Sequence, residues 1–132
     1  MGPLNPISPS GSGLDSLLGH LGKLNIKKPS TKATGNFFND LEKIAVWNKS
    51  ATVPGSDARV WRKDACGAYI KWSDYGNTNS KWGWEIDHIL PVAHGGTDAV
   101  SNLQVLHWRN NRSKGDNLGT NYCVISYTGV VG

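Results

Sequence analysis

Cysteine is scarce in this sequence, with two residues among 132. Two cysteines form at most one bridge, so the chain is not a small scaffold held together by several disulfides. No apolar run approaches the roughly 18 residues that a membrane-spanning helix needs, which predicts a soluble protein with no membrane partner. The first residues lack the charged start and apolar stretch of a secretory signal. We therefore expect an intracellular protein, with secretion by another route left open.

A strong excess of one charge is also absent from most of the chain. The net charge is +4, but residues 36–132 hold ten Lys or Arg against nine Asp or Glu, a net charge of +1. Most of the basicity therefore lies in residues 1–35, where it fits a solvated tail as well as it fits phosphate binding. Charge alone does not identify a partner.

The aromatic residues divide the chain into two parts. Residues 1–35 contain no Trp, Tyr or Phe and are rich in Gly, Pro, Ser, Thr and Lys. Such a segment buries too little apolar surface to offset its ordering entropy, so we predict a flexible N-terminal tail. Residues 36–132 hold all six Trp, all four Tyr and both Phe and are predicted to form one domain. The tryptophans are spread through this region, which favours a place in its core.

Hydrophobic periodicity predicts a helix followed by a ββα unit. Residues 37–47 have helical spacing, with Phe37, Phe38, Leu41 and Ile44 on one face. Alternating residues predict strands over 68–72, 84–90 and 103–106, and residues 107–114 form a short helical segment. The expected fold class is α+β: a small single domain with a ββα core, preceded by a helix and the flexible tail.

Polar residues with complementary chemistry gather around the end of the strand predicted over residues 84–90. Asp87 and His88 are adjacent, so their side chains point to opposite faces of a regular strand. Asn111 lies on the following helix, which must fold back over the strands to bury its apolar side and so comes near Asp87. A carboxylate and an amide oxygen are hard ligands, suited to Mg²⁺ rather than Zn²⁺.

Five short motifs between residues 84 and 116 together resemble the HNH endonuclease family. No single motif is specific, since Asp-His pairs are common, but their order and spacing are typical of HNH nuclease domains. They are Asp87-His88-Ile89, Pro91, Gly95-Gly96, Asn102-Leu103-Gln104 and Asn111-Arg112-Ser113-Lys114. The resemblance implies a ββα-metal (His-Me finger) core. Because Asn111 stands where the family name has its last His, the sequence looks like the HNN variant.

The resemblance implies a metal-dependent endonuclease that hydrolyses phosphodiester bonds of DNA. His88 would be the general base that activates water, and it is mostly neutral at pH 7 because imidazole titrates near pH ~6.5. Asn102 would orient the imidazole. Asp87 and Asn111 would bind a divalent metal, which stabilises the phosphate and the leaving oxygen. Mg²⁺ is the expected ion, with Mn²⁺ or another divalent ion as the alternative.

Basic residues on the last predicted helix are candidates for nucleic-acid binding. Arg109, Arg112 and Lys114 cluster there, and a solvated face is the alternative to phosphate contact. Lys114 is the best candidate because it belongs to the motif. DNA is favoured over RNA as the substrate. No base-reading element is recognisable, so cleavage at a defined site calls for a dimer or a protein partner.

Many HNH relatives carry two Cys-x-x-Cys pairs that bind a structural zinc. Here His107 and Asn110 stand where the second pair would lie, and Cys66 has no nearby partner in the sequence, so no structural zinc is expected. Cys66 and Cys123 are then most simply free thiols, one of them buried. His107 is expected to cap or pack the final helix.

Two other functions are compatible with the same motifs. A catalytically silent HNH fold could bind nucleic acid without cutting it, although the intact Asp87, His88, Asn102 and Asn111 argue against this. A toxin-type nuclease domain, with the tail leading to a delivery region, is the second alternative.

Overall fold

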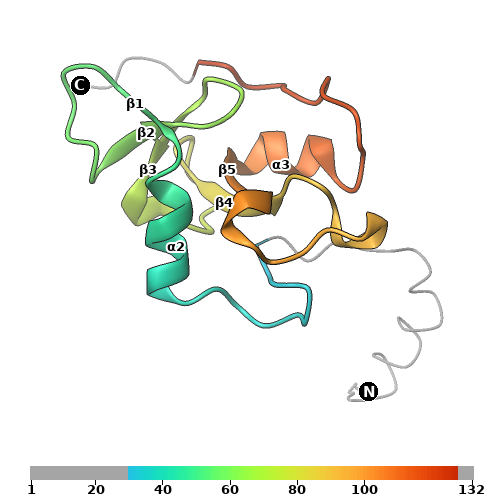
Figure 1. The fold of residues 1–132 in the computed structure, drawn as a ribbon. Coiled ribbons are helices and arrows are strands. Elements are labelled where there is room, and N and C mark those ends of the chain that lie inside the picture. Colours follow the sequence, from blue (N-terminus) through green and yellow to red (C-terminus); the bar gives the residue numbers. More distant parts are fainter. Residues whose placement is uncertain (1–29, 128–132) are drawn as a thin grey trace, which may run out of the picture.

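The structure, a computed structural model, describes residues 30–127 and contains two helices and two small antiparallel sheets in that range. Within residues 30–127, no helix is long and apolar enough to cross a membrane. The predicted α+β fold class is confirmed, and Figure 1 shows the arrangement. The elements are α2 (Asp40–Trp47), β1 (Ala51–Thr52), β2 (Trp61–Lys63), β3 (Tyr69–Lys71), β4 (Trp84–His88), β5 (Leu103–His107) and α3 (Trp108–Lys114).

The β4–β5 hairpin lies between the two helices. Its register pairs Asp87 with Gln104 and His88 with Leu103. The α2 helix packs on one face of the hairpin and α3 on the other (Figure 1). Every residue of β4 is buried because both faces of the strand are covered. This burial places the predicted site residues in a low-dielectric environment, where each polar group needs a partner.

Aromatic rings fill the face of the hairpin that α2 covers. Trp84 is fully buried, and its ring centroid lies 4.9 Å from that of Trp47 and 5.6 Å from that of Trp72. The expectation of core tryptophans therefore holds for Trp47 and Trp84. Trp72 is partly buried and packs against the same core. The expectation fails for the remaining three, which are only partly buried: Trp61, Trp82 and Trp108.

The helix predicted over residues 37–47 begins later, at Asp40, and presents a different face. Asn39 caps it, because its side chain accepts the Glu42 N–H while the Glu42 side chain accepts the Asn39 N–H. Of the four residues on the predicted apolar face, Phe38 is buried in the core, whereas Phe37 is 82% exposed, Leu41 77% and Ile44 42%. Val46 and Trp47 are buried instead, since the Trp47 ring fills the aromatic core.

Residues 30–35, which the sequence assigns to the tail, pack on the domain. Ser30 is buried and its hydroxyl accepts the Ile86 N–H at 2.9 Å. Ala33 donates its N–H to Asp98 at 2.9 Å. The folded domain thus begins before the predicted boundary at residue 36, and residues 1–29 of the predicted tail lie outside the described residues.

Cys66 and Cys123 form a disulfide, with their Cα atoms 5.6 Å apart. The prediction of two free thiols, one of them buried, was wrong on both points, because Cys66 is half-buried and Cys123 is exposed. The bond ties the C-terminal segment to the turn between β2 and β3. Fifty-seven residues separate the two positions in sequence, so only the folded chain brings them together.

A hydrogen-bond cluster, the Asp64–Asn110 cluster, lies beside this disulfide. The buried Asp64 carboxylate accepts the N–H groups of Cys66, Ala68 and His107 and the amide of Asn110. The Asn110 oxygen accepts the N–H groups of Val124 and Ile125. Hydrogen bonds and a disulfide thus join the turn between β2 and β3, α3 and the C-terminal segment.

Candidate active site

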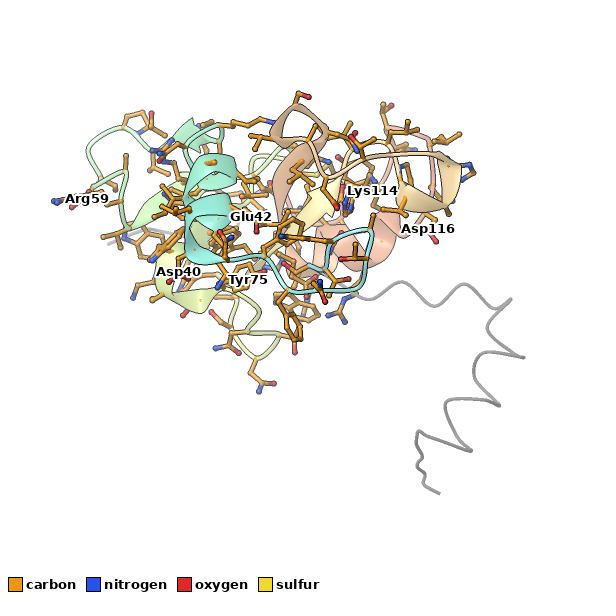
Figure 2. All side chains as sticks on the ribbon, turned by 60° about the horizontal axis from the view of Figure 1, so that its bottom comes forward. Asp40, Glu42, Arg59, Tyr75, Lys114 and Asp116 are labelled. Atoms are coloured by element: carbon orange, nitrogen blue, oxygen red, sulfur yellow. A yellow bond between two sulfur atoms is a disulfide. The ribbon has the colours of Figure 1, made fainter. Side chains whose placement is uncertain are left out.

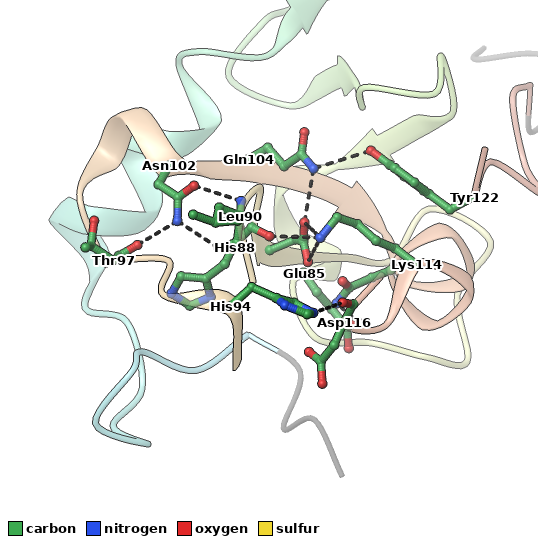
Figure 3. A network of polar contacts seen from close by, with 12 residues as sticks. Glu85, His88, Leu90, His94, Thr97, Asn102, Gln104, Lys114, Asp116 and Tyr122 are labelled. Carbon is green, nitrogen blue, oxygen red and sulfur yellow. Dashed lines mark hydrogen bonds and ion pairs between the residues drawn. The ribbon is translucent and has the colours of Figure 1, made fainter. Parts of the chain in front are cut away.

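Alternation along β4 divides the candidate site between two faces of the strand. Glu85 and Asp87 face α3, whereas His88 faces the segment before α2 and the loop that follows β4. The prediction that Asp87 and His88 point to opposite faces is confirmed. Figure 3 shows the polar contacts that surround the end of the strand.

Lys114 forms a buried ion pair with Asp87. The lysine ammonium lies 3.1 Å from Asp87 Oδ2 and also donates to the backbone oxygen of His88 at 2.9 Å. Gln104 donates to the same carboxylate at 3.0 Å (Figure 3). Asp87 is 0% exposed and Lys114 is 2% exposed. Lys114 therefore does not present its charge to a phosphate at the surface, contrary to its predicted role in nucleic-acid binding.

A second carboxylate, that of Glu85, lies on the same face and was not predicted as a site residue. Glu85 accepts the Asn111 amide at 2.8 Å and the Arg112 guanidinium at 2.9 Å. Asn111 is buried, whereas the Arg112 side chain is 48% exposed. The signal that could have found Glu85 is its position two residues before Asp87, which puts both side chains on one face of a strand.

Asp98 holds the imidazole of His88. Asp98 Oδ1 lies 2.8 Å from His88 Nε2, and the same carboxylate accepts the Ala33 N–H. Burial raises the pKa of Asp98, but the hydrogen bonds from His88 and Ala33 outweigh it, so this pKa lies below its ordinary value. The ionised carboxylate makes Nε2 the donor nitrogen, so Nδ1 is the acceptor in the neutral tautomer of the ring.

Asn102 closes the loop between β4 and β5 and does not contact the imidazole that it was expected to orient. Its side-chain oxygen accepts the Leu90 N–H, and its amide donates to the backbone oxygens of Thr97 and Leu90. A Cβ at Gly96 would stand 1.7 Å from the Leu90 oxygen, so the loop needs glycine there. By holding this loop, Asn102 fixes the segment that carries Asp98.

The donor chemistry around Asp87 fits a hard divalent cation. A carboxylate from β4 and the Asn111 amide from α3 supply the oxygen ligands that Mg²⁺ prefers. Within the described part of the chain, no three His, Cys, Asp or Glu side chains form a group that could hold a metal ion. Lys114 already neutralises Asp87, so a cation would have to compete with the ammonium for this carboxylate.

The remaining predicted residues lie around this centre. Arg109 is exposed at the start of α3, with its guanidinium 5.1 Å from the Trp108 ring centroid. His107 caps α3 as predicted, because its Nδ1 accepts the Arg109 N–H. His94 is exposed on the loop and its Nε2 lies 3.1 Å from the Asp116 backbone oxygen.

The family comparison covers the whole of this centre. Residues 66–117 match the family model described as HNH endonuclease, a range that begins just before β3 and ends just after α3. The match is to the family as a whole, and the HNN variant stays a prediction. No curated protein and no solved structure matches the chain. The ββα unit with Asp87, His88 and Asn111 and the family match agree, and residues 66–117 of this chain therefore form a domain of the HNH endonuclease family.

Proposed function

We propose that this chain is a metal-dependent endonuclease that hydrolyses phosphodiester bonds of DNA. The family match supports nuclease chemistry. The observation that carries the proposal is the hydrogen bond between His88 and Asp98, because it fixes the ring at the end of β4 and leaves Nδ1 as the acceptor of the neutral tautomer. A general base needs a fixed ring with an acceptor atom.

His88 acts as the general base in this mechanism. Its Nδ1 takes a proton from water, and the oxygen of that water forms a new bond to phosphorus as the bond to the 3′ oxygen breaks. Asp98 accepts the Nε2–H throughout and stabilises the imidazolium that forms. The 3′ oxygen leaves with the electron pair of the broken bond and takes a proton from a solvent water, so the products are a 5′-phosphate and a 3′-hydroxyl.

Asp87 and Asn111 would hold the divalent cation, with Mg²⁺ as the expected ion and Mn²⁺ as the alternative. When bound, the ion supplies Lewis-acid stabilisation of the phosphate and the leaving oxygen. Lys114 holds the Asp87 carboxylate charge-neutral before that, which prevents an unpaired anion in the interior. Arg112, half-exposed beside Glu85, is placed to contact a phosphate.

Plasmid nicking tests the proposal, with Mg²⁺, Mn²⁺ or EDTA and an RNA substrate in parallel. His88→Ala should lower metal-dependent cleavage by about 10²–10⁴-fold, the typical contribution of a general base. Arg59→Ala is the matched control, because Arg59 projects into solvent well away from Lys114 (Figure 2) and pairs only with Asp57. Equal cleavage by wild type and His88→Ala would reject His88 as the base.

A silent nucleic-acid-binding module is the second candidate, and the Lys114–Asp87 pair favours it, because a bound ammonium occupies the carboxylate that the metal needs. Nucleic-acid binding without cleavage at any divalent concentration would select this candidate. A dimer or a protein partner stays the proposed source of specificity for cleavage at defined sites.

A location inside the cell also stays a proposal, and the Cys66–Cys123 bond weighs against a reducing cytosol. Trapping of thiols in protein taken directly from its host cells tests this point. Two trapped thiols per chain support an intracellular location, whereas none supports an oxidising compartment.

A further inference from the structure

Three tryptophans at the surface each carry a cation on the ring, outside the site described above. Lys71 lies 5.5 Å from the Trp61 centroid, Lys81 lies 5.2 Å from that of Trp82, and Arg109 lies 5.1 Å from that of Trp108. The Trp61 and Trp82 rings also contact each other edge to face, at 5.2 Å. We name these six residues the cation–tryptophan face. None of the three tryptophans is fully buried.

A cavity of about 510 Å³ opens beside this face and shares Lys81, Trp108 and Arg109 with it. It lies between residues 78–81, the start of α3 and the end of the C-terminal segment, and Lys81, Trp108, Arg109 and Tyr127 line it. Tyr127 is 60% exposed. A volume of this size lies within the range of small-ligand sites, roughly 300–1,000 Å³.

The chemistry of the lining favours an aromatic anion. Two aromatic side chains and two cations line the cavity, and no Asp or Glu is among the described residues that line it. A nucleobase offers a π-face for Trp or Tyr, and its phosphates attract Lys and Arg. Bases in a duplex are covered on both faces by their neighbours, so an unpaired base fits this lining best.

The cavity and the catalytic centre lie close enough for one substrate strand to span them. Trp108 and Lys114 stand at the two ends of α3, about 9 Å apart along the helix axis at 1.5 Å per residue. Lys114 donates to His88, so the centre lies at the far end of the helix from the cavity. A single substrate strand that lies along α3 therefore reaches both the cavity and the centre.

We propose that the cavity beside the cation–tryptophan face binds an unpaired base of the substrate strand, close to the phosphate that is cut. This inference rests on the proposed nuclease function, because it places the base on the same strand as the scissile phosphate. Binding of an unpaired base makes the enzyme selective for single-stranded, frayed or flapped DNA over intact duplex.

Fluorescence anisotropy with a labelled oligothymidine and with a matched duplex tests the inference, in EDTA so that no strand is cut. Tyr127→Ala should weaken binding of the single strand by about 5- to 150-fold, the range for loss of one stacked base, and leave duplex binding unchanged. Arg109→Ala should weaken both. Arg59→Ala, an exposed arginine that does not line the cavity, should bind both as wild type does.

Trp108→Phe keeps an aromatic ring at the same place and should retain most of the preference for the single strand. Unchanged oligothymidine binding by Tyr127→Ala, or an equal loss for single strand and duplex, would overturn the inference. Circular dichroism and thermal unfolding check that each variant is folded. Because binding is measured without metal, a chain that binds as expected but cuts neither plasmid nor single-stranded DNA when Mg²⁺ or Mn²⁺ is added would reject the nuclease proposal and leave the binding site standing.

Discussion

Two buried polar clusters stand at opposite ends of α3 and are built in different ways. In the Asp64–Asn110 cluster, each donor that reaches the carboxylate is a backbone N–H or an amide. At the other end, Asp87 and Glu85 face the charged groups of Lys114 and Arg112. Fixed backbone donors cannot leave without unfolding the chain, whereas cationic side chains can be exchanged for another cation. The Asp64–Asn110 cluster therefore suits a structural role, and the cluster around Asp87 and Glu85 suits an ion-binding site.

The largest change in stability is expected when one partner is removed from the buried Lys114–Asp87 pair. Asp87→Asn should lower the free energy of unfolding by about 3–5 kcal/mol, because it leaves the Lys114 ammonium buried without its carboxylate. Lys114→Met should cost a similar amount for the opposite reason. Urea denaturation in EDTA measures both.

The double variant, Asp87→Asn with Lys114→Met, separates charge burial from packing. It should recover most of the lost stability, since neither charge is then left alone. For Lys114→Met alone, Mn²⁺ should raise the unfolding temperature more than it does for wild type, because the metal replaces the missing cation. Simple additivity of the two single changes, with no difference in the effect of Mn²⁺, would contradict the idea that Lys114 and the metal share one site.

The disulfide gives the next largest effect, at the structural end of α3. Cys66→Ser with Cys123→Ser should cost about 2–4 kcal/mol, as expected for a cross-link across some tens of residues. Plasmid cleavage per folded molecule should stay unchanged, because the catalytic centre lies at the other end of the helix. If the folded double variant lost most of its cleavage activity, the disulfide region would contribute to catalysis. The two ends of α3 would then not have separate roles.

The sequence could predict the parts of the molecule that depend on local patterns, and it could not predict those that depend on contacts between distant residues. Elements β4, β5 and α3 follow from local alternation and from motifs within about thirty residues, and they match the expected ranges to within a few residues. The face of α2 could not be predicted, because Trp47 and Trp84 decide it across the core. The disulfide, similarly, joins positions that no local pattern connects.

At the candidate site, residue types were predictable but partners were not. The motif pointed to Asp87, His88 and Asn111. That Asp98 rather than Asn102 contacts the imidazole depends on how the loop after β4 folds. The burial of Lys114 depends on the angle at which α3 crosses the hairpin, which turns the ammonium inward instead of toward solvent.

Asp64→Asn should have a smaller effect than loss of the disulfide. The new amide nitrogen would face donors that now bind the carboxylate, including the His107 N–H and the Asn110 amide, and an unsatisfied buried group costs about 1–3 kcal/mol. Urea denaturation gives the change, and plasmid cleavage per folded molecule should again match wild type. If Asp64→Asn lost cleavage as Asp87→Asn is expected to, the structural assignment of this cluster would fail.

The smallest expected effect is a pH dependence of stability from His107. Burial lowers the pKa of this imidazole, although its contact with the Lys81 oxygen opposes the shift. Because the unfolded chain then binds the proton more readily, the contribution of His107 is complete above the unfolded pKa of about 6.5 and is lost as the pH falls below it. The neutral ring is also what the cap requires, since Nδ1 must accept the Arg109 N–H.

Urea midpoints at about pH 7.5 and about pH 5.5, on either side of that value, measure the effect. His107→Asn keeps a capping side chain but does not titrate, so it should lose less stability on acidification than wild type does. Both proteins share every other titrating group, so the difference between them isolates this ring. An equal loss in the two would mean that His107 takes up its proton as easily in the folded chain as in the unfolded one. The cluster at the start of α3 would then accommodate a charge, as the one around Asp87 already does.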